Sequence, residues 1–264
     1  EALFRQLTQA NSAYPLAVYE YGCFKLLTGD YEEAWPLFQR RLDDEVFKSK
    51  DTMKMQQPFW DGRPAPDKTL LVHIEQGIGD AILCARYIPA AADLVGDLIF
   101  AVHSRNGRFF SSIDSRIRMV EMGDPMPEFD IHIDVFSLPV FFGAAPSNIP
   151  KPPYLRAEPQ LVAKWRERLA GPEFKVGLAW QGNPDHLRDA ERSMKLIDMV
   201  PLMKVPETQF YGLQIGVGAE QARDLPVDLK FESLEDDLKG SDDNMVDAAA
   251  VVENLDLVIS IDSA

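Results

Sequence analysis

The chain has 264 residues, of which 46% are hydrophobic and 26% are charged, as in an ordinary globular protein of one or two domains. Its net charge of −15 argues against nucleic acid as a partner, because binding to phosphate backbones needs a basic surface. No apolar run approaches the ~20 residues of a membrane span, and the two cysteines, Cys23 and Cys84, lack metal-ligand spacing. We therefore expect a cytoplasmic protein with reduced, buried thiols.

Residues 1–48 are predicted to be α-helical. Apolar side chains recur at helical spacing over residues 16–27 and again over residues 34–42. Between these two segments, Gly29 can end one helix and Asp30 can cap the next. The pattern therefore predicts a helical hairpin.

The hairpin resembles one tetratricopeptide repeat, a unit of ~34 residues. Small and aromatic residues occupy the positions where that repeat places them: Gly22, Gly29, Tyr31, Ala34 and Phe38. In the repeat, the small residues let two helices approach closely and the aromatic residues fill the gap between them. The resemblance implies a region that binds proteins or peptides, and a generic pair of packed helices is the alternative.

Residues 49–68 are predicted to be a linker, since three prolines forbid a regular helix there. We expect Phe59 and Trp60 to attach this linker to the domain that follows it.

From residue 69 onward, strand-like and helix-like segments alternate in two series, 69–154 and 155–264, which predicts two parallel sheets with helices on their faces. In the first series we expect strands at 69–74, 97–102, 117–121 and 129–134, and helices at 80–93, 105–113 and 137–142. In the second we expect strands at 175–180, 209–214, 228–232 and 256–261, and helices at 159–170, 194–204, 217–224 and 244–254. The acidic run 232–244 is expected to be a solvated loop. The predicted fold class is α/β, with two Rossmann-like domains after a helical hairpin. Because the second series stops on a strand, we expect that domain to be incomplete at Ala264.

One candidate site is the segment E-Q-G-I-G-D-A (75–81), which follows an apolar strand and opens a helix. Gly77 and Gly79 allow a tight turn and close approach of the backbone to a ligand. Asp80 is placed in the first helical turn, at the sheet edge where ligands bind in open parallel sheets. A carboxylate there suits proton transfer from an acceptor hydroxyl better than pyrophosphate binding. The alternative is that Asp80 only caps the helix.

A second candidate site is the polar segment 178–195, which also follows a strand. Arg192 and Lys195 are candidates to neutralise a diphosphate, and an arginine binds such anions in a forked geometry. Ser193 is expected to cap the following helix and to add its hydroxyl to the anion site. The alternative is a solvated surface loop.

The ends of two other strands supply further candidates. Asp262 is placed to bind a ribose hydroxyl, and Ser263 to face phosphate, unless the pair is only a cap between strand and helix. Gln214 is placed to contact a base or sugar. Three histidines lie in strand-like runs: His73, His103 and His132. None has a partner at ligand or triad spacing, so they are predicted to be structural.

Together, G-I-G-D-A-I-L-C-A-R-Y-I-P in the first domain and V-G-L-A-W-Q-G-N-P…R-S…V-I-S-I-D-S in the second resemble bacterial GT-B glycosyltransferases, above all heptosyltransferase-like proteins. In that architecture, two Rossmann-like domains face a cleft. More narrowly, the chain resembles bacterial proteins that fuse tetratricopeptide repeats to such a domain and are similar to O-linked N-acetylglucosamine transferases. The resemblance implies that Asp80 is the general base. It also implies a set of ligand-binding residues: Gly77, Gly79, Gln181, Asn183, Arg192, Ser193, Lys195, Gln214, Asp262 and Ser263.

The function implied is inverting transfer of a sugar from a nucleotide sugar to a protein or glycan hydroxyl. No D-x-D pair stands at a strand end, so we expect no metal ion and no other cofactor. Relatives often carry a lysine where this chain has Ile215, and a histidine usually follows their counterpart of Asp262 and Ser263. Two alternatives stay open: a protein-binding scaffold with a degenerate GT-B domain, and a sugar-nucleotide epimerase that needs no acceptor.

Overall fold

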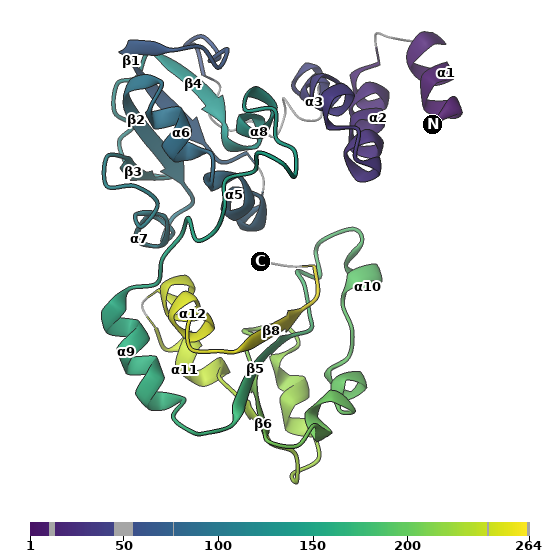
Figure 1. Ribbon diagram of the computed structural model, residues 1–264, viewed down its shortest axis with the longest axis vertical. Helices are drawn as coiled ribbons and strands as arrows, with labels where there is room; N and C mark the ends of the chain where they lie inside the picture. The colour runs from purple at the N-terminus through teal and green to yellow at the C-terminus, as the bar shows by residue number, and fades with distance from the viewer. Residues whose placement is uncertain (11–13, 45–54, 76, 242, 263–264) are drawn as a thin grey trace. The chain divides into compact units, whose positions relative to one another are not determined.

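The computed structural model describes residues 1–10, 14–44, 55–75, 77–241 and 243–262. The chain divides into two compact units, Glu1–Leu155 and Arg156–Ala264, and each contains a four-stranded parallel sheet (Figure 1). In the described ranges, no helix is both long enough and apolar enough to cross a bilayer.

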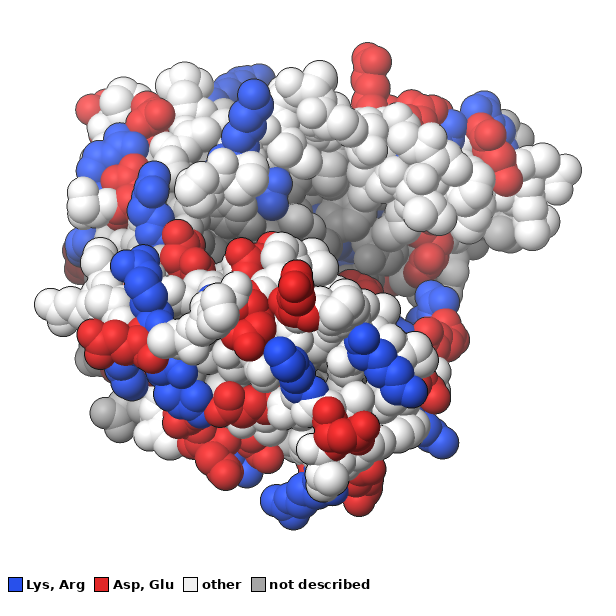
Figure 2. All heavy atoms as spheres, turned by 60° about the horizontal axis from the view of Figure 1, so that its bottom comes forward, with Lys and Arg blue, Asp and Glu red and all other residues white. Residues whose placement is uncertain are grey.

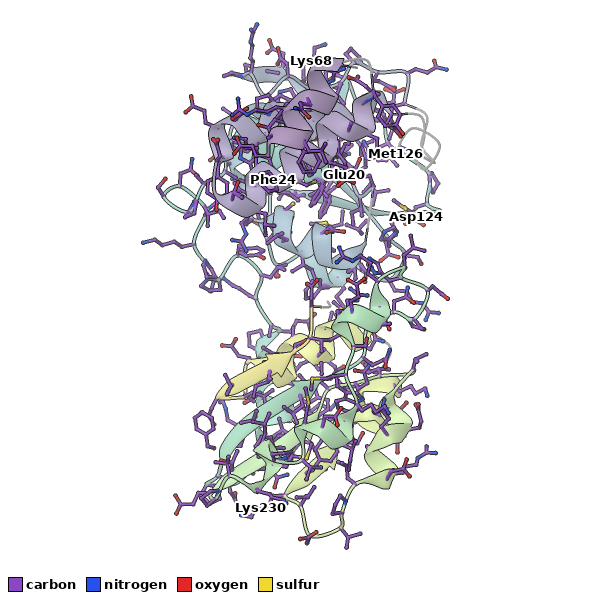
Figure 3. All side chains as sticks on the ribbon, turned by 90° about the vertical axis from the view of Figure 1, so that its right-hand side faces the viewer. Glu20, Phe24, Lys68, Asp124, Met126 and Lys230 are labelled. Carbon is purple, nitrogen blue, oxygen red and sulfur yellow. The ribbon has the colours of Figure 1, made fainter. Side chains whose placement is uncertain are left out.

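The first unit begins with a helical region: α1 (Ala2–Ala10), α2 (Pro15–Thr28), α3 (Tyr31–Gln39) and the 3-10 turn η1 (Arg40–Asp43). Gly29 ends α2 with φ of 86°, a left-handed conformation that glycine adopts without strain, as the sequence predicted. A Cβ on Gly22 would lie 2.5 Å from the backbone nitrogen of Phe38, so α2 and α3 touch closely at this position. Phe24, labelled in Figure 3, contacts Phe4 of α1 with 5.6 Å between ring centroids. The predicted hairpin is therefore present.

The sheet of the first unit has the order β3-β2-β1-β4, with all strands parallel. Its strands are β1 (Ala65–His73), β2 (Val95–Val102), β3 (Arg118–Glu121) and β4 (Ile131–Asp134). The helical segments are α5 (Ile78–Ala85), α6 (Ile88–Ala92), α7 (Gly107–Phe110), η2 (Val135–Ser137) and α8 (Leu138–Phe141). The helix predicted at 80–93 is thus two helices. Pro89 cannot continue α5, but it fits the first turn of α6, where its missing N–H is harmless.

The end of the predicted linker is joined to this sheet. Trp60 is buried in the core, and its backbone N–H donates to the carbonyl of His132 at 2.8 Å. Phe59 meets the ring of His132 edge-on. Residues 49–54 of the linker, and residues 45–48 before it, lie outside the described residues. The last part of the linker is strand rather than coil, because β1 already begins at Ala65.

The sheet of the second unit has the order β7-β6-β5-β8, again all parallel. Its strands are β5 (Phe174–Ala179), β6 (Thr208–Gly212), β7 (Phe231–Ser233) and β8 (Leu257–Ser260). The α-helices are α9 (Pro159–Arg168), α10 (Asp189–Arg192), α11 (Glu235–Lys239) and α12 (Asn244–Val252). The remaining turns are 3-10 helices: η3 (Leu196–Met199), η4 (Leu202–Lys204) and η5 (Ala219–Asp224).

Three predictions for this unit are wrong. The helix expected at 217–224 is the 3-10 helix η5. The helix expected at 194–204 is a pair of 3-10 turns separated near Pro201, whose ring prevents a continuous α-helix. The acidic run 232–244 is not a solvated loop, because it contains the end of β7 and the helix α11. Leu234 and Leu238 anchor that segment in the core with no exposed surface. Leu234 and Leu238 are spaced as on one face of a helix, but the charged residues around them hid this pattern in the sequence.

Both sheets therefore follow one rule: in chain order, the strands are arranged third, second, first, fourth. This is the order of a Rossmann half, and ligands bind such sheets at the carboxyl ends of the first and fourth strands, where the order reverses. In the first unit that point lies between β1 and β4, where His73 pairs with Asp134. In the second it lies between β5 and β8, where Ala179 pairs with Ser260.

Candidate functional site

The second unit has a pocket of about 590 Å³ at the carboxyl edge of its sheet. The loops after β5 and β6, the end of β8 and the start of α12 form its walls. Three predicted donor-binding residues line it: Gln181, Asn183 and Gln214. Ile215 and Asn244 are also in the lining. The volume is in the range of small-molecule sites, and the position is where an open parallel sheet binds its ligand.

Gln214 holds the corner after β5 in shape. Its Oε1 accepts hydrogen bonds from the backbone nitrogens of Trp180 at 3.3 Å and Gln181 at 3.0 Å. Its Nε2 donates to the carbonyls of Gln181 and Val217, both at 3.0 Å. These bonds use the amide's donors and acceptor together. The structure thus gives Gln214 a positioning role, and its contact with a base or sugar stays a prediction.

Asp189 is the centre of a polar cluster that the sequence did not single out. This buried carboxylate of α10 accepts hydrogen bonds from Ser193 Oγ at 2.9 Å, Arg192 Nε at 3.2 Å and Gln181 Nε2 at 2.8 Å. Ser193 Oγ in turn accepts from the backbone nitrogen of Gly182 at 2.9 Å. The prediction that Ser193 caps the next helix is therefore wrong, because its hydroxyl bonds back to the β5 corner.

Arg192 connects this cluster to the end of β8. Its Nη1 donates to the backbone carbonyl of Asp262 at 2.9 Å, so two predicted donor-site residues lie together. The side chain of Arg192 is 21% exposed and shares its charge with Asp189. Lys195, three residues after Arg192, is exposed to solvent. Ser263 lies outside the described residues. Among the residues that the structure describes, the pocket lining includes neither Arg192 nor Lys195.

The first-sheet corner, residues 75–81, leads from β1 into α5. Gly77 is the N-cap of α5, and Asp80 is the third residue of the helix, so Asp80 does not occupy the N-cap position. Gly77 has φ of −69°, which any residue adopts, so the turn itself does not need this glycine. The atom nearest to a Cβ built there is Oδ2 of Asp80 at 3.5 Å. The half-buried carboxylate thus turns back toward the helix N-terminus, whose dipole favours negative charge.

A buried arginine also reaches this edge from the helical hairpin. Arg41 of η1 has no exposed surface, and its Nε bonds to Glu75 Oε1 at 3.0 Å. Its Nη2 bonds to Asp134 Oδ1 at 2.6 Å and to Ser137 Oγ at 2.9 Å, and Nη1 to Gln39 Oε1 at 3.0 Å. We call these five residues the Arg41 cluster. The sequence held one signal for it, since an arginine occupies an apolar position in the helical pattern of residues 34–42.

The thiol of Cys84 connects the Arg41 cluster to Asp80. Burial, together with the carboxylates of Asp80 and Asp134, raises the pKa of Cys84 to about 12, while Arg41 and Arg86 act in the opposite direction. Cys84 lies one turn after Asp80 and therefore on the same face of α5. α5 packs against η2, which holds Ser137, and the charges of Arg41 and Asp134 act on Cys84, so Cys84 lies near the Arg41 cluster.

Two of the histidines predicted to be structural, His73 and His132, are neighbours. Nε2 of His73 lies 3.2 Å from Nδ1 of His132, across the neighbouring strands β1 and β4. Their spacing of 59 residues carries no motif, and only the strand register brings them together. The pair is half-buried within the sheet, and a structural role remains the best interpretation.

The surface charge is mixed rather than concentrated. On the face shown in Figure 2, acidic and basic side chains alternate over both units. At the amino end of β1, Lys68, labelled in Figure 3, pairs with Asp130 at 3.4 Å. Exposed pairs of this kind contribute little to stability.

Two parallel sheets with Rossmann strand order, each with polar residues gathered where that order reverses, make an α/β fold that is similar to the GT-B fold of a heptosyltransferase. No family model matches the chain. It is similar to Escherichia coli ADP-heptose LPS heptosyltransferase II, with a TM-score of 0.52 and 9% identity over 74% of this chain and 79% of that one. It is also 25% identical to Protein FlbA of Caulobacter vibrioides over 265 residues, 90% of this chain. The chain spans 44% of the length of FlbA.

Proposed function

We propose that this chain belongs to an inverting, metal-independent glycosyltransferase, which moves a sugar from a nucleotide sugar to a hydroxyl of a protein or glycan in the cytoplasm. One observation carries the proposal: the pocket of about 590 Å³ lies where the strand order reverses in the second sheet, within a fold similar to that of a heptosyltransferase. The helical hairpin, as a tetratricopeptide repeat, would help to recognise a protein acceptor.

The second unit would bind the donor. Gln181 and Asn183 line the pocket, and Gln214 keeps its wall in place. Arg192 and Lys195 would neutralise the diphosphate, with Asp262 and Ser263 near the ribose and phosphate. Positive charge placed at the leaving diphosphate stabilises the transition state, which is the task that a metal ion has in other transferases.

The first unit would present the acceptor, with Gly77 and Gly79 allowing close approach to the corner. Asp80 would accept the proton of the acceptor hydroxyl as its oxygen attacks the anomeric carbon from the face opposite the nucleotide. The bond from that carbon to the diphosphate oxygen breaks, and the nucleoside diphosphate leaves with the electron pair. This mechanism requires the carboxyl edges of the two sheets to face a shared cleft.

The variant Asp80→Asn tests this mechanism. We expect the transfer rate to fall by about 10²- to 10⁴-fold, the usual contribution of a general base, with donor affinity unchanged in calorimetric titration. Asp67→Asn is the matched control, because Asp67 is exposed at the opposite end of β1. Full activity of Asp80→Asn would remove Asp80 from the mechanism.

The alternative is a non-catalytic scaffold with a degenerate donor site. Two observations favour it: Ile215 stands in the pocket wall where relatives often carry a lysine, and Asp189 already pairs with Arg192. Calorimetric titration of the full-length protein with a panel of nucleotides and nucleotide sugars separates the two ideas. Binding of none of them would favour the scaffold.

A further inference from the structure

We propose that Arg41 is a positioning residue of the first-sheet corner, and that the helical hairpin is therefore part of the acceptor site rather than an attached module. The claim that Arg41 affects Asp80 rests on the proposed function. The claim that Arg41 holds the corner rests on the contacts of the Arg41 cluster alone.

The geometry of the guanidinium carries the argument. Its bonds join the hairpin to Glu75, the first residue of the corner, and to Asp134, the last residue of β4. Aromatic rings of Phe38 and Phe136 lie 4.7 and 5.7 Å from the guanidinium carbon and restrict its plane. A planar group with five N–H donors can satisfy these partners at once, and a lysine ammonium cannot.

Stability alone does not explain this arrangement. A buried ion pair is a weak source of stability, since removing both charges from water offsets most of their attraction. Apolar side chains would fill an interface between a hairpin and a sheet at least as well. The arginine differs from them because its planar group fixes the orientation of its partners. It holds Glu75, which follows β1, beside Asp134, the last residue of β4.

The electrostatic surroundings link this cluster to Asp80. Asp80, Asp134, Arg41 and Arg86 all act electrostatically on the thiol of Cys84, which lies one turn after Asp80 in α5. Glu75 and Asp134 already occupy the guanidinium of Arg41. Glu75 is also the first residue of the corner that carries Asp80, so a change in the cluster alters the position of Asp80.

The first test compares Arg41→Lys with Arg40→Lys. Arg40 is the neighbouring arginine, and it makes only an exposed ion pair with Asp43 among the contacts described. In hydrogen exchange on the full chain, we expect Arg41→Lys to speed exchange of amides 77–85 by about tenfold or more. Amides of β2 and of the second unit should exchange at the wild-type rate, and Arg40→Lys should change nothing. Unchanged exchange at 77–85 in Arg41→Lys overturns the inference.

The second test uses hydrolysis of whichever nucleotide sugar of the panel binds, with water in place of the acceptor. We expect Arg41→Lys to lower kcat by about tenfold while leaving the KM for the nucleotide sugar unchanged. Arg40→Lys, the control, should leave both constants at their wild-type values.

The outcomes separate the two proposals. A kcat that stays at the wild-type value in Arg41→Lys, with or without a rise in KM, overturns the positioning role. A wild-type protein that binds and hydrolyses none of the nucleotide sugars overturns the proposed function. In that case, the exchange comparison still decides whether Arg41 holds the corner.

Discussion

Replacing Gly182 with alanine tests whether the Asp189 cluster belongs to the donor site. A Cβ on Gly182 would lie 2.5 Å from Asp189 Oδ1, and 2.8 and 2.9 Å from Nη2 and Nε of Arg192. Ordinary contacts begin near 3.4 Å, so both the carboxylate and the guanidinium must move by about half an ångström or more. Both groups of the Asp189–Arg192 ion pair are therefore displaced.

The displacement has a calculable cost. Moving Arg192 weakens its bond to Asp189 at 3.2 Å and its bond to the Asp262 carbonyl at 2.9 Å. Hydrogen bonds to charged groups contribute about 1.5–3 kcal/mol each, and partial exposure of Arg192 places the loss at the lower end. The same guanidinium is proposed to bind the diphosphate of the donor, so its displacement weakens donor binding. A loss of about 1.5 kcal/mol there corresponds to about a tenfold weaker Kd.

Calorimetric titration measures this change with the nucleotide sugar that binds the wild type, and urea unfolding gives the stability of each variant. Gly240→Ala is the control, because it adds a methyl group at the end of α11, where the nearest atom is a carbonyl oxygen at 3.2 Å. If Gly182→Ala binds the donor as tightly as the wild type does, the Asp189 cluster is not part of the donor site.

Two further predictions concern the first unit. Gly22→Ala should lower the free energy of unfolding by about 1–3 kcal/mol, because its Cβ would meet backbone atoms of Phe38 and Leu37 at 2.5 and 2.9 Å. Urea unfolding measures this, and since alanine normally stabilises a helix relative to glycine, an unchanged or higher stability would contradict the close contact. The thiol of Cys84 has a pKa of about 12 in the folded protein and about 8.5 in the unfolded chain. Between pH ~8.5 and ~12 the unfolded chain therefore loses the thiol proton while the folded protein keeps it, so the free energy of unfolding falls by about 1.4 kcal/mol per pH unit. Below pH ~8.5 both states keep the proton and this loss is absent. Unfolding measured at pH 8, 9 and 10 should show a steeper loss of stability in the wild type than in Cys84→Ala, and equal slopes would refute the buried thiol.

Local patterns in the sequence determined the elements of this fold. Gly29 ends α2 because only its own backbone must become left-handed, and this requirement is visible without any knowledge of the partner helix. The apolar runs at β1 and β5 lie in buried strands for the same kind of reason, since side-chain periodicity is a property of neighbouring residues. The class of the fold, two series of alternating strands and helices, followed from these local signals.

The hydrogen-bond partners of the polar residues were decided by the tertiary structure. Gln214 was expected to face a ligand, yet its amide holds the backbone of Gln181, 33 residues away. Arg41 and Asp134 are 93 residues apart, and no spacing rule connects them. The Gln214 contact exists because parallel strands place their carboxyl ends at one edge, and the order and register of the strands choose which ends meet. The Arg41 contact exists because the helical hairpin packs beside the end of β4, where Phe38 meets Phe136. The sequence thus named Gln181, Asn183 and Gln214, while only the folded chain, whose strand order is decided by packing across the whole sheet, added Asp189 and Arg41 and assigned the partners.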